Sequence, residues 1–216
     1  MRLRRRAPLS PGRGTLVLGG VATAAVAGVL IGEVGRVWRR GSAPLPQETH
    51  DLLAAAEEAV AETAEVARVG YREGSTRENS LFNLLTSFAA TFIAVRSLTY
   101  ALRDRRSVGP FRSVRVGRRH IHHFVPGIVI AFGAGSGAIL THNERLEPWL
   151  ALPFGVGMGL TLDESAMLLE LEDVYWSREG LLSVQITLAV ISLLGALALG
   201  LRFLRRGERV VLERPP

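Results

Sequence analysis

Five apolar segments, separated by charged stretches, restrict the fold of this chain more than any other feature. They are residues 15–32, 80–102, 124–140, 149–171 and 181–204. Each is close to the length of about 20 residues that an α-helix needs to cross a lipid bilayer. The hydrophobic residues, 48% of the chain, are concentrated in these blocks. The sequence therefore predicts an all-α, multi-pass integral membrane helical bundle of about five spans, with one soluble amphipathic helix.

The composition divides the chain into four parts. Residues 1–40 combine a basic start with the first apolar segment and predict an N-terminal membrane anchor. A cleaved secretory signal is the alternative, but no good small-x-small cleavage site precedes Arg36. Residues 41–79 predict a linker and an acidic amphipathic helix, residues 80–206 a four-helix membrane domain, and residues 207–216 a basic tail.

The composition also excludes several kinds of chemistry. There is no cysteine, so disulfides, thiolate metal sites and cysteine nucleophiles are excluded. All 26 basic residues are arginine, which excludes lysine-dependent catalysis and lysine-containing phosphate loops. Because the arginines flank the apolar segments, we expect anionic lipid headgroups, and not nucleic acid, as their partners. The loop 103–119, with seven arginines, is the main candidate for this contact.

The arginines are divided almost evenly between the two sides of the predicted bundle, so counting them does not fix its orientation. We place the N-terminus inside because a compact basic head leads the first span. The arginine-rich loop 103–119 would also be hard to translocate. These choices predict a multi-pass protein of the plasma (inner) membrane whose acidic helix lies outside.

Residues 47–71 predict that acidic helix. Its apolar side chains recur at spacings of three or four residues, at Leu53, Ala56, Val60, Ala64 and Ala67. Glutamates cover its other faces. Because the apolar side is mostly alanine, its packing would be shallow. We expect the helix to lie on its own chain or to pair with a second copy, which would make the protein a homo-oligomer.

Two glycine clusters predict a close pair of membrane helices. They consist of Gly133, Gly135 and Gly137 in the third segment and Gly155, Gly157 and Gly159 in the fourth. An antiparallel hairpin with its turn near Arg145 places Gly135 opposite Gly155 and Gly133 opposite Gly157. Small residues let membrane helices approach closely and pack by van der Waals contact.

The same register brings histidines near acids that lie inside an apolar span. Ionisable groups at such depth are costly and usually face a partner or an aqueous cavity. Imidazole and carboxylate together are a common ligand set for zinc, iron or manganese. The predicted metal ligands are His120, His122, His123, Asp163 and Glu164. Arg96 and Glu170 are expected to contact these ligands from outside the metal's own coordination sphere.

Two alternatives explain the same residues without a metal. An ion pair of Arg96 with Asp163 or Glu164 would compensate the buried acids, while the histidines lie at the membrane interface. The third possibility is proton or lipid-headgroup chemistry at a site that holds no metal. The sequence assigns no catalytic residue.

The pattern HIHHFVPG, followed by a glycine-rich span, GMGLTLDE and DVYW, resembles that of a group of small, uncharacterised actinobacterial integral membrane proteins. The resemblance covers about residues 80 to 205 and leaves out the N-terminal anchor and the acidic helix. It implies a membrane-helical fold, and it implies no established activity.

Two functional hypotheses follow. The first is a polar site of histidine, aspartate and glutamate within the membrane that holds a metal and acts on a lipid-like substrate by hydrolysis or oxidation. The second is a non-enzymatic membrane scaffold or assembly partner, in which the acidic helix pairs with another chain and the arginine loop holds anionic lipid.

Overall fold

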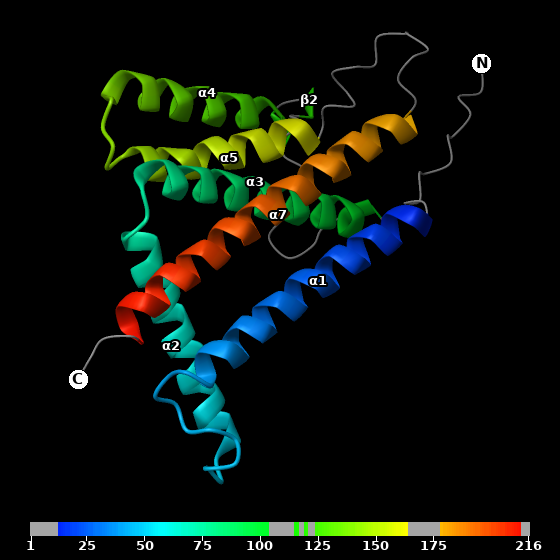
Figure 1. Ribbon diagram of the computed structural model, residues 1–216. Coiled ribbons are helices and arrows are strands. Elements are labelled where there is room, and N and C mark those ends of the chain that lie inside the picture. The colour runs from blue at the N-terminus through cyan, green and yellow to red at the C-terminus, as the bar shows by residue number, and fades with distance from the viewer. Residues whose placement is uncertain (1–12, 104–114, 117–118, 121–123, 164–177, 213–216) are drawn as a thin grey trace. The chain divides into compact units, whose positions relative to one another are not determined.

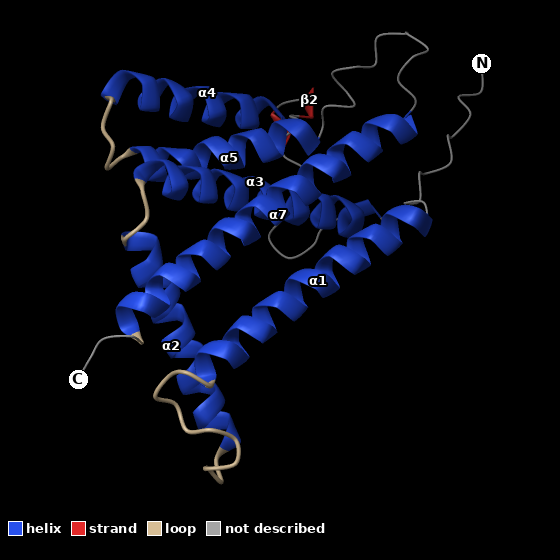
Figure 2. Cartoon of the chain, in the orientation of Figure 1, coloured by secondary structure: helices blue, strands red, loops and turns tan. Residues whose placement is uncertain are grey.

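The computed structural model describes residues 13–103, 115–116, 119–120, 124–163 and 178–212. Within these residues the regular secondary structure is helical apart from β1 (Arg115–Val116) and β2 (Arg119–His120), which pair antiparallel (Figure 1, Figure 2). The helices are α1 (Arg13–Trp38), α2 (Leu52–Arg72), α3 (Thr76–Arg103), α4 (Phe124–Thr141), α5 (Glu147–Asp163) and α7 (Arg178–Val211). The chain forms two compact units, residues 1–62 and residues 63–216.

Four helices in the described part of the chain are long and apolar enough to cross a membrane. These spans are Gly20–Trp38, Thr76–Leu98, Phe124–Thr141 and Leu188–Val211. The fifth predicted span, 149–171, is described only as far as Asp163, where α5 has 17 residues. The predicted all-α membrane fold is therefore confirmed, with four of its spans identified by length and composition.

In the first unit, the segment that follows α1 makes side-chain hydrogen bonds with the end of α1 and with α2. The indole nitrogen of Trp38 donates a hydrogen bond of 2.8 Å to the carbonyl oxygen of Pro44. The backbone N–H of Ser42 donates to the carboxylate of Glu62 at 3.0 Å. Gly41 lies so close to Glu62 that an added Cβ atom would overlap its carboxylate. The glycine leaves room for the chain to pass over the carboxylate end of this α2 side chain.

Helix α2 is buried along a face that lies beside the apolar stripe expected from the sequence, and not along that stripe. Ala55, Ala59 and Val66 are buried, whereas Leu53 and Val60 are 72% and 54% exposed. Two of these three buried residues are alanines, whose small side chains allow close packing against this face of α2. Leu53 and Val60 remain on the open side of α2.

Helices α2 and α7 cross within the second unit at two glycines. A Cβ atom at Gly70 would overlap the carbonyl oxygen of Phe203, and one at Gly207 would overlap the carbonyl oxygen of Val66. Beside the crossing, the rings of Tyr71 and Phe203 meet edge to face with centroids 5.4 Å apart. The two glycines thus let the backbones touch, and the aromatic rings fill the space next to them.

Four helices of the second unit lie side by side in the order α4, α5, α3, α7 (Figure 1). Helix α5 packs against both α4 and α3, and α3 packs against α7. Helices α3 and α5 begin, and α4 and α7 end, at one end of the unit, which we call the Glu78 end. The opposite end holds the end of α5 at Asp163 and is called the Asp163 end.

The glycines of α5 allow close contact with two neighbouring helices, α4 and α3. A Cβ atom at Gly157 would lie 2.5 Å from the backbone nitrogen of Ala131 and 2.6 Å from the carbonyl oxygen of Gly127, both on α4. One at Gly159 would lie 3.1 Å from the carbonyl oxygen of Phe88 on α3. Both contacts are with backbone atoms, so larger side chains at these positions would push the helices apart.

The pairing of the two glycine clusters differs from the expected one. Gly155 faces α3, where a Cβ atom would overlap the carbonyl oxygen of Leu84. On α4, a Cβ atom at Gly135 would lie 3.2 Å from the Phe154 ring, and one at Gly133 would meet no atom within 4 Å. Residues two apart point to nearly opposite sides of a helix. Alternate glycines of α5 therefore contact α3 and α4 in turn, because α5 lies between them.

The last glycine of the α4 cluster faces a side chain. A Cβ atom at Gly137 would lie 3.5 Å from a methyl group of Leu150 on α5, which is ordinary van der Waals contact. Close backbone approach between α4 and α5 is therefore concentrated at Gly127 and Gly157, nearer the Asp163 end.

Candidate functional site

A buried ion pair joins α3 to α5 at the Asp163 end. The Nε atom of Arg96 lies 2.8 Å from Oδ1 of Asp163, and the Asp163 side chain is only 3% exposed. These two atoms form an ion pair and not an aligned hydrogen bond. A second guanidinium nitrogen of Arg96 donates a hydrogen bond of 3.3 Å to the backbone carbonyl of Asp163. Arg96 therefore holds both the side chain and the backbone at the end of the described part of α5.

An aromatic ring on α3 packs against the Arg96 guanidinium. Phe92 lies one turn earlier on α3, and the Arg96 guanidinium lies 5.4 Å from the centre of its ring. Such a cation–π contact stabilises a guanidinium that is partly removed from water. Arg96 is 27% exposed at its side chain, whereas its partner is buried. The pair thus meets the requirement that a charge inside a membrane protein has a charged partner.

The start of α4 adjoins the same end of α5. A Cβ atom at Gly127 would lie 2.7 Å from the hydroxyl oxygen of Thr161 and 2.8 Å from Cβ of Leu160. The histidine segment immediately precedes α4, and Asp163 follows Thr161 by two residues. The sequence predicts that the histidine segment lies near the end of α5, and this contact is consistent with that prediction.

The five predicted metal ligands are only partly described. His120 lies in β2, where its backbone is paired with Arg115. His122, His123, Glu164 and Glu170 lie outside the described residues. Over the ranges that the structure does describe, no three histidine or carboxylate groups are placed to hold a metal ion. The metal site therefore remains a prediction, while the Arg96–Asp163 contact proposed as its alternative is present.

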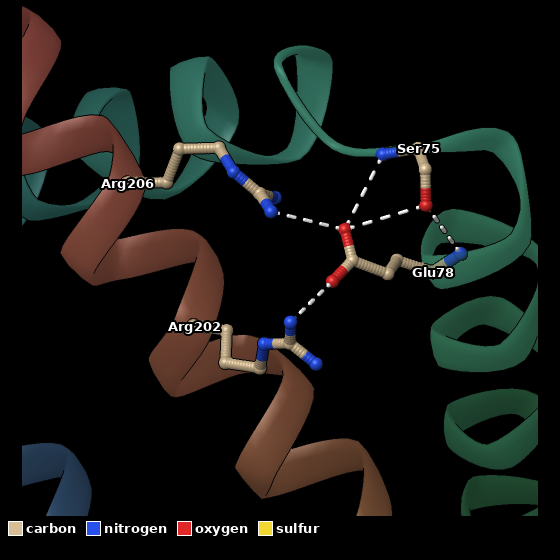
Figure 3. Close-up of polar contacts among 4 residues, drawn as sticks. All are labelled: Ser75, Glu78, Arg202 and Arg206. Atoms are coloured by element: carbon tan, nitrogen blue, oxygen red, sulfur yellow. Dashed lines mark hydrogen bonds and ion pairs between the residues drawn. The ribbon is translucent and has the colours of Figure 1, made fainter.

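A second polar cluster lies at the Glu78 end and joins α3 to the end of α7 (Figure 3). The carboxylate of Glu78 lies 2.9 Å from a guanidinium nitrogen of Arg202 and accepts a hydrogen bond of 3.0 Å from Arg206. Glu78 also accepts a 3.3 Å hydrogen bond from the backbone N–H of Ser75, whose hydroxyl accepts one from the N–H of Glu78. The reciprocal contact is a capping box, as the sequence S-x-x-E indicates.

An asparagine adds a third connection at the same end. The side-chain nitrogen of Asn83 donates to the hydroxyl of Tyr71 at 2.9 Å and to the carbonyl oxygen of Pro148 at 2.7 Å. Asn83 on α3 therefore contacts both α2 and the start of α5. Sequence reasoning missed the contacts of Asn83 and those of Glu78 with α7.

For the Glu78 contacts, the available signal was the four-residue spacing of Arg202 and Arg206, which puts two charges on one face of the helix.

Comparison with protein-family models, with curated proteins and with solved structures found no match. The assignment of a function therefore depends on the geometry of this chain alone.

Proposed function

We propose that this chain is a non-enzymatic scaffold or assembly protein of the plasma membrane that associates with a second copy of itself through residues 47–71. The observation that carries this proposal is the open apolar face of α2, where Leu53 and Val60 are 72% and 54% exposed. Large apolar side chains on an otherwise charged helix outside the membrane favour a protein partner. Membrane anchoring restricts the copies to one plane, which favours their encounter.

The ion pair at the Asp163 end supports the same conclusion. A buried acid in a membrane helix indicates function by default, but a charged partner gives it a structural role. Asp163 contacts Arg96 and lies where α5 meets α3. A guanidinium beside the carboxylate also opposes binding of a metal cation at the same oxygen. The pair is therefore assigned to holding the helices together.

The proposal predicts that Val60→Glu abolishes self-association. A glutamate at this position would place a charge in the middle of the apolar contact, and we expect at least about a tenfold weaker dimer, equivalent to about 1.4 kcal/mol. Chemical crosslinking of the full chain in membranes and sedimentation in detergent measure the change. The matched control is Ala61→Glu, which adds the same charge on the exposed side near Glu57 and Glu58. An equal loss in both variants, or dimers in neither protein, would contradict the proposal.

The second candidate function is a metal site that acts on a lipid-like substrate, with zinc, iron or manganese held by His120, His122, His123, Asp163 and Glu164. Two observations favour it. The start of α4 contacts the end of α5 at Thr161, and Asp163 is buried there. Arg96 and Glu170 would then orient the ligands, and the metal would supply Lewis-acid or redox chemistry.

Metal content separates the two candidate functions. If the second is correct, protein purified in mild detergent without chelator or histidine tag carries nearly one metal ion per chain, and His122→Ala loses it. Asp163→Asn is expected to lose it as well, because a carboxylate ligand is removed. Elemental analysis gives the result. A metal-free wild-type protein after supplementation with zinc, iron and manganese would exclude the metal site and leave the scaffold.

A further inference from the structure

One face of α7 changes from apolar to cationic along the helix. Ile191 and Leu194 are 60% and 51% exposed, and Ala198 is exposed too. The same face continues with the exposed side chains of Arg202, Arg205 and Arg209. All six positions are separated by three or four residues, the spacing that places side chains on one side of a helix. We call this set the α7 face.

The cationic part of the α7 face borders a hollow of about 320 Å³. The residues that line it are Leu201, Arg202, Arg205, Arg206 and Arg209. Its volume is at the lower end of the range of about 300–1,000 Å³ that is typical of small-ligand sites. The hollow is an open groove, because all of its lining residues belong to α7. Four guanidinium groups border it, and guanidinium forks match the oxygens of a phosphate.

The carboxylates near these arginines lie behind the hollow. Glu78, which contacts Arg202 and Arg206, is 18% exposed at its side chain. Glu208 is 5% exposed and lies 3.8 Å from Arg205, which is itself 46% exposed. The carboxylates hold the arginines from the protein side, so the guanidinium groups of Arg202 and Arg205 remain accessible from outside.

The dimensions of the α7 face match one leaflet of a bilayer. From Ile191 to Arg202 the helix rises by about 16 Å at about 1.5 Å per residue. This is close to half of the about 30 Å hydrocarbon core. An acyl chain alongside Ile191, Leu194 and Ala198 would therefore bring its own phosphate to the height of the arginines. An acidic protein segment would use the arginines but not the apolar half of the face.

We propose that the α7 face binds an anionic phospholipid, with its phosphate in the arginine-lined hollow and an acyl chain along Ile191, Leu194 and Ala198. This site is separate in sequence from the α2 contact and from the arginine loop 103–119. It adds a specific lipid partner at the Glu78 end of the membrane domain.

The test compares lipid binding by the full chain in mild detergent, measured by native mass spectrometry. The probes are phosphatidylglycerol and phosphatidylcholine with identical acyl chains. We expect wild-type protein to prefer phosphatidylglycerol. The variant Arg205→Gln/Arg209→Gln should lose about 25-fold of that preference, at about fivefold per arginine, and Arg209→Gln alone about fivefold. Neither substitution touches the Glu78 contacts.

The matched control is Arg77→Gln/Arg145→Gln, which removes the same charge from exposed positions at the Glu78 end and should keep the preference. An equal loss in the control would mean that net charge alone attracts the lipid and would overturn the site. Unchanged preference in Arg205→Gln/Arg209→Gln would overturn it too. Displacement of the lipid by equimolar inorganic phosphate would indicate a soluble anion as ligand, and displacement by an equimolar acidic peptide would indicate a protein partner. Either displacement also overturns the proposal.

Discussion

Asp163→Asn is expected to destabilise the membrane domain by about 3–5 kcal/mol, the cost of leaving one member of a buried ion pair without its partner. In wild-type protein the Nε atom of Arg96 lies 2.8 Å from the Asp163 carboxylate. The asparagine removes the negative charge while keeping the size of the side chain. Unfolding in mixed micelles with increasing denaturing detergent measures the loss.

Two further variants separate the ion pair from other effects of the substitution. Replacing both members, as Arg96→Met/Asp163→Leu, should recover most of the lost stability, because apolar side chains of similar volume fill the same space without a charge to compensate. Glu65→Gln is the control for an exposed pair. Arg68 donates to the Glu65 carboxylate at 2.6 Å, and this hydrogen bond lowers the pKa of Glu65. Solvent screens this pair, so its loss should have little effect.

The outcome also bears on function. If the double replacement is as stable as wild type and still associates with its partner, the ion pair is purely structural. If it is stable but inactive in the cell, the charges have a role beyond helix packing. An Asp163→Asn protein as stable as wild type would contradict the assignment of the pair to helix packing.

Gly157→Ala is expected to cost about 1–3 kcal/mol, the usual penalty for adding a methyl group to a filled interior. The new Cβ atom would lie 2.5 Å from the backbone nitrogen of Ala131, so α4 and α5 would have to separate. Backbone atoms cannot move aside as a flexible side chain can. The same micelle unfolding experiment measures the change.

Gly133→Ala is the matched control on the neighbouring helix. A Cβ atom at Gly133 would meet no atom within 4 Å, so alanine should be neutral or stabilise the helix by up to about 1 kcal/mol. Opposite effects of the two substitutions would support the helix order α4, α5, α3. Similar effects of both substitutions would contradict the close contact at Gly157.

The sequence predicts the helices well because apolar length alone decides whether a segment can span a membrane. It predicts their ends less well. The last span was expected to end at residue 204, but α7 continues to Val211. In this last part of the helix, Arg202 and Arg206 are paired with Glu78 on α3. A partner so distant in sequence cannot be found from local hydropathy.

The candidate site at the Asp163 end could also be predicted only in part from the sequence. A charged residue inside an apolar segment must have a partner, so Arg96 and Asp163 could be named from the sequence. The sequence left open whether Asp163 faces an arginine or a metal, because helical spacing gives the face of a helix and not its neighbour. In the same way, the sequence did not show which neighbouring helix each glycine of α5 faces. Gly155 and Gly159 face α3 because α5 lies between α3 and α4.

The capping box at the start of α3 has a consequence for how the protein is made. Glu78 and Arg206 are separated by 128 positions, so the ribosome completes α3 long before the arginine exists. During that interval Ser75 alone holds the carboxylate at the membrane border, through contacts only three residues apart. Synthesis of α7 then supplies Arg202 and Arg206. The bundle is thus closed by its last helix, and a nascent chain that stops before residue 202 leaves the insertion machinery with Glu78 not yet neutralised.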